Sequence, residues 1–178
     1  MKSFFILSVV LCSFFQQNEN IIVWNKDRKL KYSDFEGILL DSTSVYLAAT
    51  SCDIRKEYFL DSNVIKYNVF SFFKKNKSFI IELDSNLLMH EQFHFNISEL
   101  HARFIRRYLN EVKTYDVDTI KLQINNIIKH KRTFDSLYDK ETLHGAYYTM
   151  QKKWNVNIEK MLDSLKEYEN PEGTVILN

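Results

Sequence analysis

Hydrophobic positions in the first half of the chain form short runs that are typical of β-strands. Residues 21–82 contain four segments rich in β-branched and aromatic residues, separated by polar, turn-like stretches. The segments are IIVW, which starts at Ile21, SVYLAATSCDI, which starts at Ser44, VIKYNVFSFF, which starts at Val64, and KSFIIEL, which starts at Lys77. This part of the sequence predicts an N-terminal antiparallel β-sheet.

After residue 85 the apolar residues recur at spacings of three and four, which is typical of amphipathic helices. Near the end of the first helix, the arginine pair at 106–107 is expected to face solvent. Pro171 and Gly173 are expected to end the last helix. The sequence therefore predicts an α+β fold in which the sheet is followed by about three helices, over residues 86–112, 116–137 and 146–168.

The N-terminus differs from the rest of the chain. Residues 4–15 form an uninterrupted apolar run between Lys2 and the polar stretch QQNEN. The run is too short to span a bilayer comfortably, and its layout predicts a secretory signal peptide over residues 1–19. The alternatives are a retained anchor, a buried first strand, or lipidation at Cys12, although Leu11 stands where a small residue would be expected. We therefore expect an exported protein that is periplasmic, associated with the outer membrane or secreted.

Length and composition narrow the class of protein. The chain has 178 residues and is 45% hydrophobic, which suits a single domain with a real core, expected over residues 20–178. Its 24 basic and 23 acidic residues nearly balance, and no basic stripe interleaved with aromatic residues suggests a nucleic-acid partner. Removal of the signal would leave one cysteine, Cys52, so that the core, together with any metal, must provide the stability.

Residues 90–94 contain the pattern His-Glu-x-x-His. On a helix, for which Asp84 or Ser85 is a suitable N-cap, residues four apart lie on the same face. His90 and His94 would then present two imidazoles to one point, as two zinc bonds of about 2.0–2.1 Å require. Glu91 is turned by roughly 100° and can take a proton from water beside the metal. The pattern predicts a zincin-like active-site helix.

The alternative is an ordinary helix that happens to carry two histidines. Hydrophobic residues surround the motif, and two neighbouring half-buried imidazoles would be costly there unless they bind something. The surrounding residues are Leu87, Leu88, Phe93 and Phe95, and they favour a metal site.

A zinc site needs a third protein ligand, for which the sequence offers four candidates. Glu99 faces the opposite side of the same helix, and His101 lies roughly 10 Å further along its axis. His130 stands in the basic stretch IIKHKR, where an imidazole complements a helix dipole. His144 is followed by Gly145, which permits a sharp turn that brings the ring close. The spacing alone leaves open whether His144 is a ligand or an exposed residue of a capped turn.

Three further residues are candidates for supporting roles. Asp139 is expected to hold the second nitrogen of a ligand histidine, which is the usual arrangement behind a metal ligand. Tyr138 and Tyr147 carry phenols that can donate a hydrogen bond to an oxyanion.

Taken together, these segments resemble a bacterial family of predicted secreted zinc-dependent proteases that is described mostly as a domain of unknown function. The most specific pieces are the His-Glu-x-x-His helix and the segment YDKETLHG, about 45 residues beyond it. The resemblance extends over nearly the whole mature chain, through LKYSDFEG, AATS, FFKKNKSFI and MQKKWNVNI. It implies that His144 binds zinc together with His90 and His94.

The expected function is hydrolysis of peptide bonds in a peptide or protein substrate, with Zn²⁺ as the cofactor and Glu91 as the general base. The substrate is expected to add as a strand beside SVYLAATSCDI. The alternatives are an envelope protein in which zinc, held with help from Glu99 or His101, has a purely structural role, and a metal-free binding module.

Overall fold

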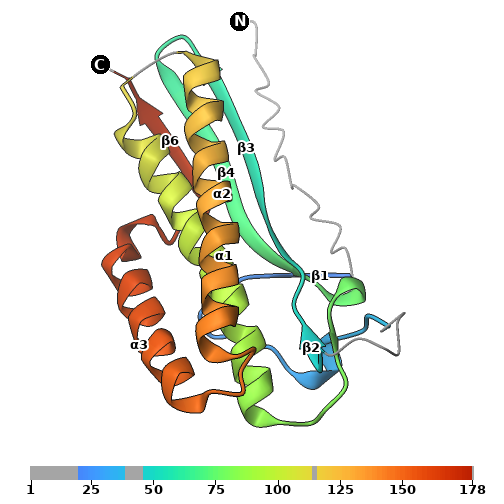
Figure 1. Cartoon of the computed structure of the whole chain (residues 1–178). Helices are drawn as coiled ribbons and strands as arrows, with labels where there is room; N and C mark the ends of the chain where they lie inside the picture. The colour runs from blue at the N-terminus through green and yellow to red at the C-terminus, as the bar shows by residue number, and fades with distance from the viewer. Residues whose placement is uncertain (1–19, 39–45, 114–115, 178) are drawn as a thin grey trace, which may run out of the picture.

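In the computed structural model, which describes residues 20–38, 46–113 and 116–177, an antiparallel sheet is covered by three helices (Figure 1). This confirms the predicted α+β class and the order of strands before helices. The proposed signal peptide at residues 1–19 and the first two residues of the segment beginning at Ser44 lie outside the described residues.

The sheet is built around one long hairpin. Strands β3 (Cys52–Asp61) and β4 (Val64–Lys74) pair antiparallel along their full length, from Asp61 opposite Val64 to Cys52 opposite Phe73. Strands β1 (Ile21–Val23) and β6 (Glu172–Ile176) share the other edge of β4, one at each end. The sequence did not predict β6, because Pro171 and Gly173 indicated only the end of a helix.

A second, two-stranded sheet consists of β2 (Ala48–Ala49) and β5 (Phe79–Ile80). Three short 3₁₀ turns complete the connections, and they are η1 (Tyr32–Asp34), η2 (Lys75–Lys77) and η3 (Lys166–Tyr168). Both short strands fall within segments expected to form longer strands. Residues 81–83 of the expected KSFIIEL segment are loop, whereas the last three residues of SVYLAATSCDI belong to β3. The loop before β2 contributes to the cleft described below.

The three helices are α1 (Ser85–Glu111), α2 (Val117–Thr142) and α3 (Tyr148–Ser164). Asp84 caps α1, since its carboxylate accepts hydrogen bonds from the amides of Asn86 and Leu87. Helix α2 continues five residues beyond the expected end, because YDKET extends the helix instead of forming a turn. Helix α1 lies between the sheet and the other two helices (Figure 1).

Two clusters of buried apolar side chains fix α1 in this central position. One joins strands β3 and β4 to the C-terminal half of α1 and the N-terminal half of α2. It includes Ile65, Val69, Ile105, Leu109, Ile120 and Ile124. The other joins α1 to α2 and α3, and includes Phe93, Ile97, Leu100, Tyr138, Ile158 and Leu162. Because both sides of α1 are covered, most of its polar residues from His90 to Arg106 are also buried, and His94 is half-buried.

Arg106 corrects the expectation that both arginines of the pair face solvent. It is 1% exposed, whereas Arg107 is exposed. Its guanidinium donates to the carbonyl oxygens of Val69 (2.8 Å) and Tyr168 (2.6 Å), and it pairs with Glu99 at 3.0 Å. The side chain therefore ties the sheet and the segment after α3 to the central helix.

We expect Arg106→Met to lower the free energy of unfolding by about 3 kcal/mol, because the substitution removes half of the charge compensation of the buried Glu99. Arg107→Met is the matched control and should cost no more than about 1 kcal/mol, the contribution of its contact with the Phe104 ring. Urea unfolding followed by circular dichroism measures both. Equal losses in the two variants would contradict a special role for Arg106.

Candidate metal centre

Two pairs of polar residues face each other across the α1–α2 hairpin. His90 and His94 lie one turn apart on α1, and Asp135 and Asp139 lie one turn apart on α2. Because the two helices are consecutive and antiparallel, His90 lies opposite Asp139 and His94 lies opposite Asp135. The register of the hairpin thus brings four potential ligands into one layer.

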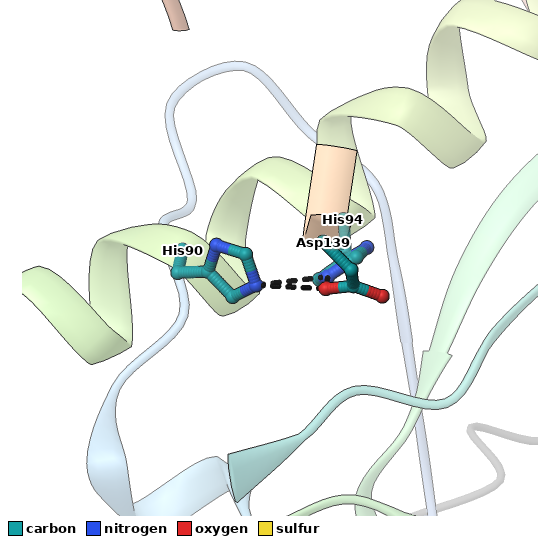
Figure 2. Close-up of side chains that lie close together, drawn as sticks. All are labelled: His90, His94 and Asp139. Atoms are coloured by element: carbon teal, nitrogen blue, oxygen red, sulfur yellow. Dashed lines mark hydrogen bonds and ion pairs between the residues drawn. The ribbon is translucent and has the colours of Figure 1, made fainter. Parts of the chain in front are cut away.

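Three of the side chains converge on one point (Figure 2). The Nε2 atoms of His90 and His94 are 3.2 Å apart, and they lie 3.0 and 2.9 Å from Oδ1 of Asp139. A tetrahedral zinc ion with bonds of about 2.0–2.1 Å holds its ligand atoms about 3.3 Å apart. The three atoms therefore come within a few tenths of an ångström of one face of such a tetrahedron, and the donor set suits zinc.

Asp139 thus lies closer to the centre than the sequence predicts. The expectation was that its carboxylate would hold the second nitrogen of a ligand histidine. Instead it approaches the two Nε2 atoms, which are the nitrogens available to a metal. The expected supporting role belongs to Asp135, which sequence reasoning missed, although its spacing of four from Asp139 repeats that of the two histidines.

Asp135 orients His94 from behind. Its Oδ1 accepts a hydrogen bond from Nδ1 of His94 at 3.1 Å, and its Oδ2 pairs with Nζ of Lys131 at 2.7 Å. With Nδ1 held as the donor, Nε2 of His94 is directed at the centre. This is the carboxylate–histidine arrangement that fixes the tautomer of a metal ligand.

Charges are strongly coupled in this layer. Burial alone would lower the pKa of His94, but its hydrogen bonds to Asp135 and Asp139 outweigh burial and raise that pKa to about 10. Burial lowers the pKa of His90. Burial also opposes ionisation of Asp139, yet the two histidines hold its pKa well below the usual range. Without a metal, therefore, a positive charge on His94 stands between two carboxylates, where a cation can replace the proton.

Tyr138 positions both imidazoles. Its ring stacks on His90, with centroids 4.6 Å apart, and meets His94 edge-on at 5.2 Å. Its hydroxyl donates to Oδ1 of Asn155 on α3 and is not part of the cleft wall. Tyr147 precedes α3, is 48% exposed and is also absent from that wall. Neither phenol therefore lines the cleft, and an oxyanion role for either stays a prediction.

Glu91 forms part of the wall of a cleft of about 640 Å³ that opens onto the centre. The residue is 3% exposed, and no hydrogen-bond partner among the described residues reaches its Oε2. Other parts of the wall come from the segment before and within β2, from α2 and from the turn after α2. A buried carboxylate oxygen without a partner is rare.

His144 lies at the mouth of this cleft and outside the three-atom group. Its side chain is 53% exposed, its Nδ1 is 3.4 Å from Oδ1 of Asp139, and its ring contacts that of Tyr46 edge-on at 5.1 Å. The geometry thus brings the predicted ligand next to the centre, while Asp139 occupies the position beside both imidazoles.

The turn that carries His144 is unusual. Leu143, His144 and Gly145 have φ values of 53°, 51° and 90°, three successive residues in left-handed conformations. A Cβ on Gly145 would lie 3.2 Å from Cβ of His90. The expected role of Gly145 in a sharp turn is confirmed, and the glycine also allows the turn to pack against a ligand histidine.

The remaining candidates are engaged elsewhere. Glu99 pairs with Arg103 and Arg106 at 3.1 and 3.0 Å. His101 donates from Nδ1 to the carbonyl of Ile97, and its Nε2 lies 2.9 Å from Nδ1 of His130. His130 lies within α2 and not at the helix end that the sequence suggested. These contacts account for all three alternatives to His144, which are Glu99, His101 and His130.

No known protein family, curated protein or solved structure matches the chain significantly. The site is therefore defined by its own geometry and by the motifs in the sequence.

We expect Asp139→Asn to weaken zinc binding on the order of 100-fold or more, because it removes the charged member of the three-atom group. His144→Gln should weaken it by less than about tenfold, since the imidazole lies outside that group. Competition titration with a chromogenic chelator measures both affinities. A larger loss for His144→Gln would instead make His144 the third ligand.

The buried His101, which contacts His130, predicts that the free energy of unfolding decreases in acid. Burial lowers the pKa of His101 to about 4, below its ordinary value of 6.5. The neutral ring thus contributes stability that is complete above pH 6.5 and is lost as the pH falls towards 4, by roughly 3 kcal/mol. His101→Leu should unfold with a correspondingly smaller pH dependence over this window in the presence of a chelator. Parallel pH profiles for variant and parent would refute the assignment.

Proposed function

We propose that the protein is a zinc-dependent metallopeptidase. His90, His94 and Asp139 would hold the ion, with His144 beside the open side of the site. A bound zinc ion supplies Lewis acidity, which acidifies water and polarises a substrate carbonyl. The observation that carries the proposal is Glu91, a residue of the cleft wall beside this ligand group, whose buried Oε2 has no hydrogen-bond partner among the described residues.

Glu91 is suited to the role of general base. It follows His90 directly, so that its side chain is turned away from the ligand direction while remaining in the same cleft. A carboxylate there can take a proton from the attacking water and pass it to the departing amine. Because its Oε2 has no partner among the described residues, no existing hydrogen bond would have to break first.

The cleft offers a surface for an extended peptide. Strand β2 pairs with β5 on one edge, and no described strand pairs with its other edge. Ala48 and Ala49 of β2 form part of the cleft wall. A substrate that added as a strand to β2 would run past the ligand group, which supports a polypeptide substrate.

A structural zinc site is the second candidate. It is supported by the position of His144, whose Nδ1 is 3.4 Å from Oδ1 of Asp139 and which a small movement would bring to the ion as a fourth ligand. A site closed by four protein ligands would have no position for water and no catalytic role. Activity of the zinc-loaded protein separates the two candidates.

Export remains part of the proposal. The apolar run at residues 4–15 supports a signal peptide, and the protein would act in the periplasm, at the outer membrane or outside the cell. In the part of the chain that the structure describes, no helix is long and apolar enough to cross a membrane.

We expect Glu91→Gln to retain zinc with unchanged stoichiometry and to lower kcat/KM by roughly 100-fold to 10,000-fold, because an amide cannot accept the proton. Glu82→Gln, an exposed position outside the cleft, is the matched control and should behave as the parent does. Hydrolysis of a quenched fluorescent peptide library and elemental analysis of the same samples provide the two readouts. Full activity of Glu91→Gln would exclude Glu91 as the base.

A further inference from the structure

We infer that the cleft continues beyond the ligand group into a cationic groove along α2, and that this groove binds an acidic segment of a polypeptide. This inference rests on the proposed function, because the bound polypeptide is a substrate only if the protein is a peptidase. The cationic groove is defined by Arg132, Ser136 and Lys140.

The groove and the cleft form one continuous depression. The groove encloses about 740 Å³, and its wall includes Tyr46, Asp135, Asp139, Leu143 and His144, which also line the cleft. The ligand group therefore lies at the junction of the two. A polypeptide bound across the centre would extend into the groove on one side.

The two parts differ in chemistry. Away from the ligand group the cleft wall is mainly apolar, with Leu47, Ala48, Ala49, Cys52, Leu87 and Ala146. The groove instead adds a stripe of Arg132, Ser136 and Lys140, which lie four residues apart along one face of α2. Eight helical residues rise about 12 Å, a length matched by three to four residues of an extended chain.

No ion pair among the described residues neutralises the cations of the groove. Arg132 and Lys140 are both exposed, and neither forms an ion pair with an acidic residue of the described chain. Two carboxylates also line the groove and are already engaged, Asp135 with Lys131 and His94, and Asp139 with the two ligand histidines. Carboxylates of a bound polypeptide are therefore the complementary partner.

A polyanionic nucleic acid fits this surface less well. The neighbouring Thr133 and Leu137 are uncharged, and the exposed Lys129, one turn before Arg132, adds one further cation, so that the track carries three charges. Nucleic-acid affinity depends on neutralising many phosphates along a surface. With a net charge of +1 on the whole chain, the groove favours a few carboxylates on a peptide.

The test measures peptide binding to zinc-loaded Glu91→Gln full-length protein by fluorescence anisotropy at low salt. The probes are labelled decapeptides with a central Ala-Leu pair, flanked on one side or the other by Glu-Asp-Glu or by the uncharged Gln-Asn-Gln. We expect the acidic version on one of the two sides to bind about fivefold more tightly, as two exposed ion pairs allow, and salt to remove the difference.

Charge reversal locates the effect. Arg132→Glu combined with Lys140→Glu should abolish the preference while leaving zinc content unchanged. Lys152→Glu combined with Lys153→Glu, on the exposed surface of α3, makes the same change in net charge and should preserve it. Equal binding of acidic and uncharged peptides, or equal effects of the two double variants, would overturn the inference.

Failure of the groove and failure of the enzyme give different results. Hydrolysis by the parent protein without an acidic preference would reject the groove and retain the peptidase. The opposite outcome is a preference for acidic peptides that only the groove variant loses, together with no hydrolysis by the parent protein. That outcome would retain the groove and reject the peptidase. Tighter binding of a single-stranded DNA oligomer than of the acidic peptides would reject the polypeptide ligand.

Discussion

The centre depends on how α1 packs against α2. One antiparallel register brings three pairs of residues together across the hairpin. The pairs are His90 with Asp139, His94 with Asp135, and His101 with His130. The apolar clusters on both sides of α1 hold that register, and Tyr138 packs its ring against both ligand imidazoles. A shift of one residue would turn every one of these side chains away from its partner, because neighbouring helical positions differ by about 100°. The chemistry of the site is therefore set by helix packing.

The sequence predicted the features that depend on local pattern. The class of the fold and the boundaries of α1, to within one residue, follow from apolar spacing, and Asp84 was one of the two expected caps. The pairing of His90 with His94 follows from helix geometry alone. The sharp turn at Gly145 was also predictable, because few other residues adopt its φ of 90°.

The features that the sequence did not predict depend on contacts between distant segments. Asp139 approaches the centre only because α2 continues through YDKET, and the extra helical turn is stabilised by the buried Thr142, whose hydroxyl donates to the carbonyl of Tyr138. Arg106 is buried because backbone carbonyls of β4 and η3 accept its hydrogen bonds, and no local pattern reveals such acceptors. Strand β6 forms only because β4 offers it an edge.

The backbone conformation of the turn from Leu143 to Gly145 lowers the stability of the fold while it positions His144 at the site. Two residues with side chains are held in left-handed conformations, at a cost of about 1–2 kcal/mol each. Amides of the turn compensate in part, since those of His144 and Tyr147 donate to the carbonyls of Asp139 and Thr142. Asparagine or glycine at position 143 would relax the backbone and stabilise the protein, yet it would also loosen the segment that holds His144 beside the ligands. Selection for thermal stability alone would consequently favour substitutions in this turn first, and these would change the geometry at the mouth of the cleft.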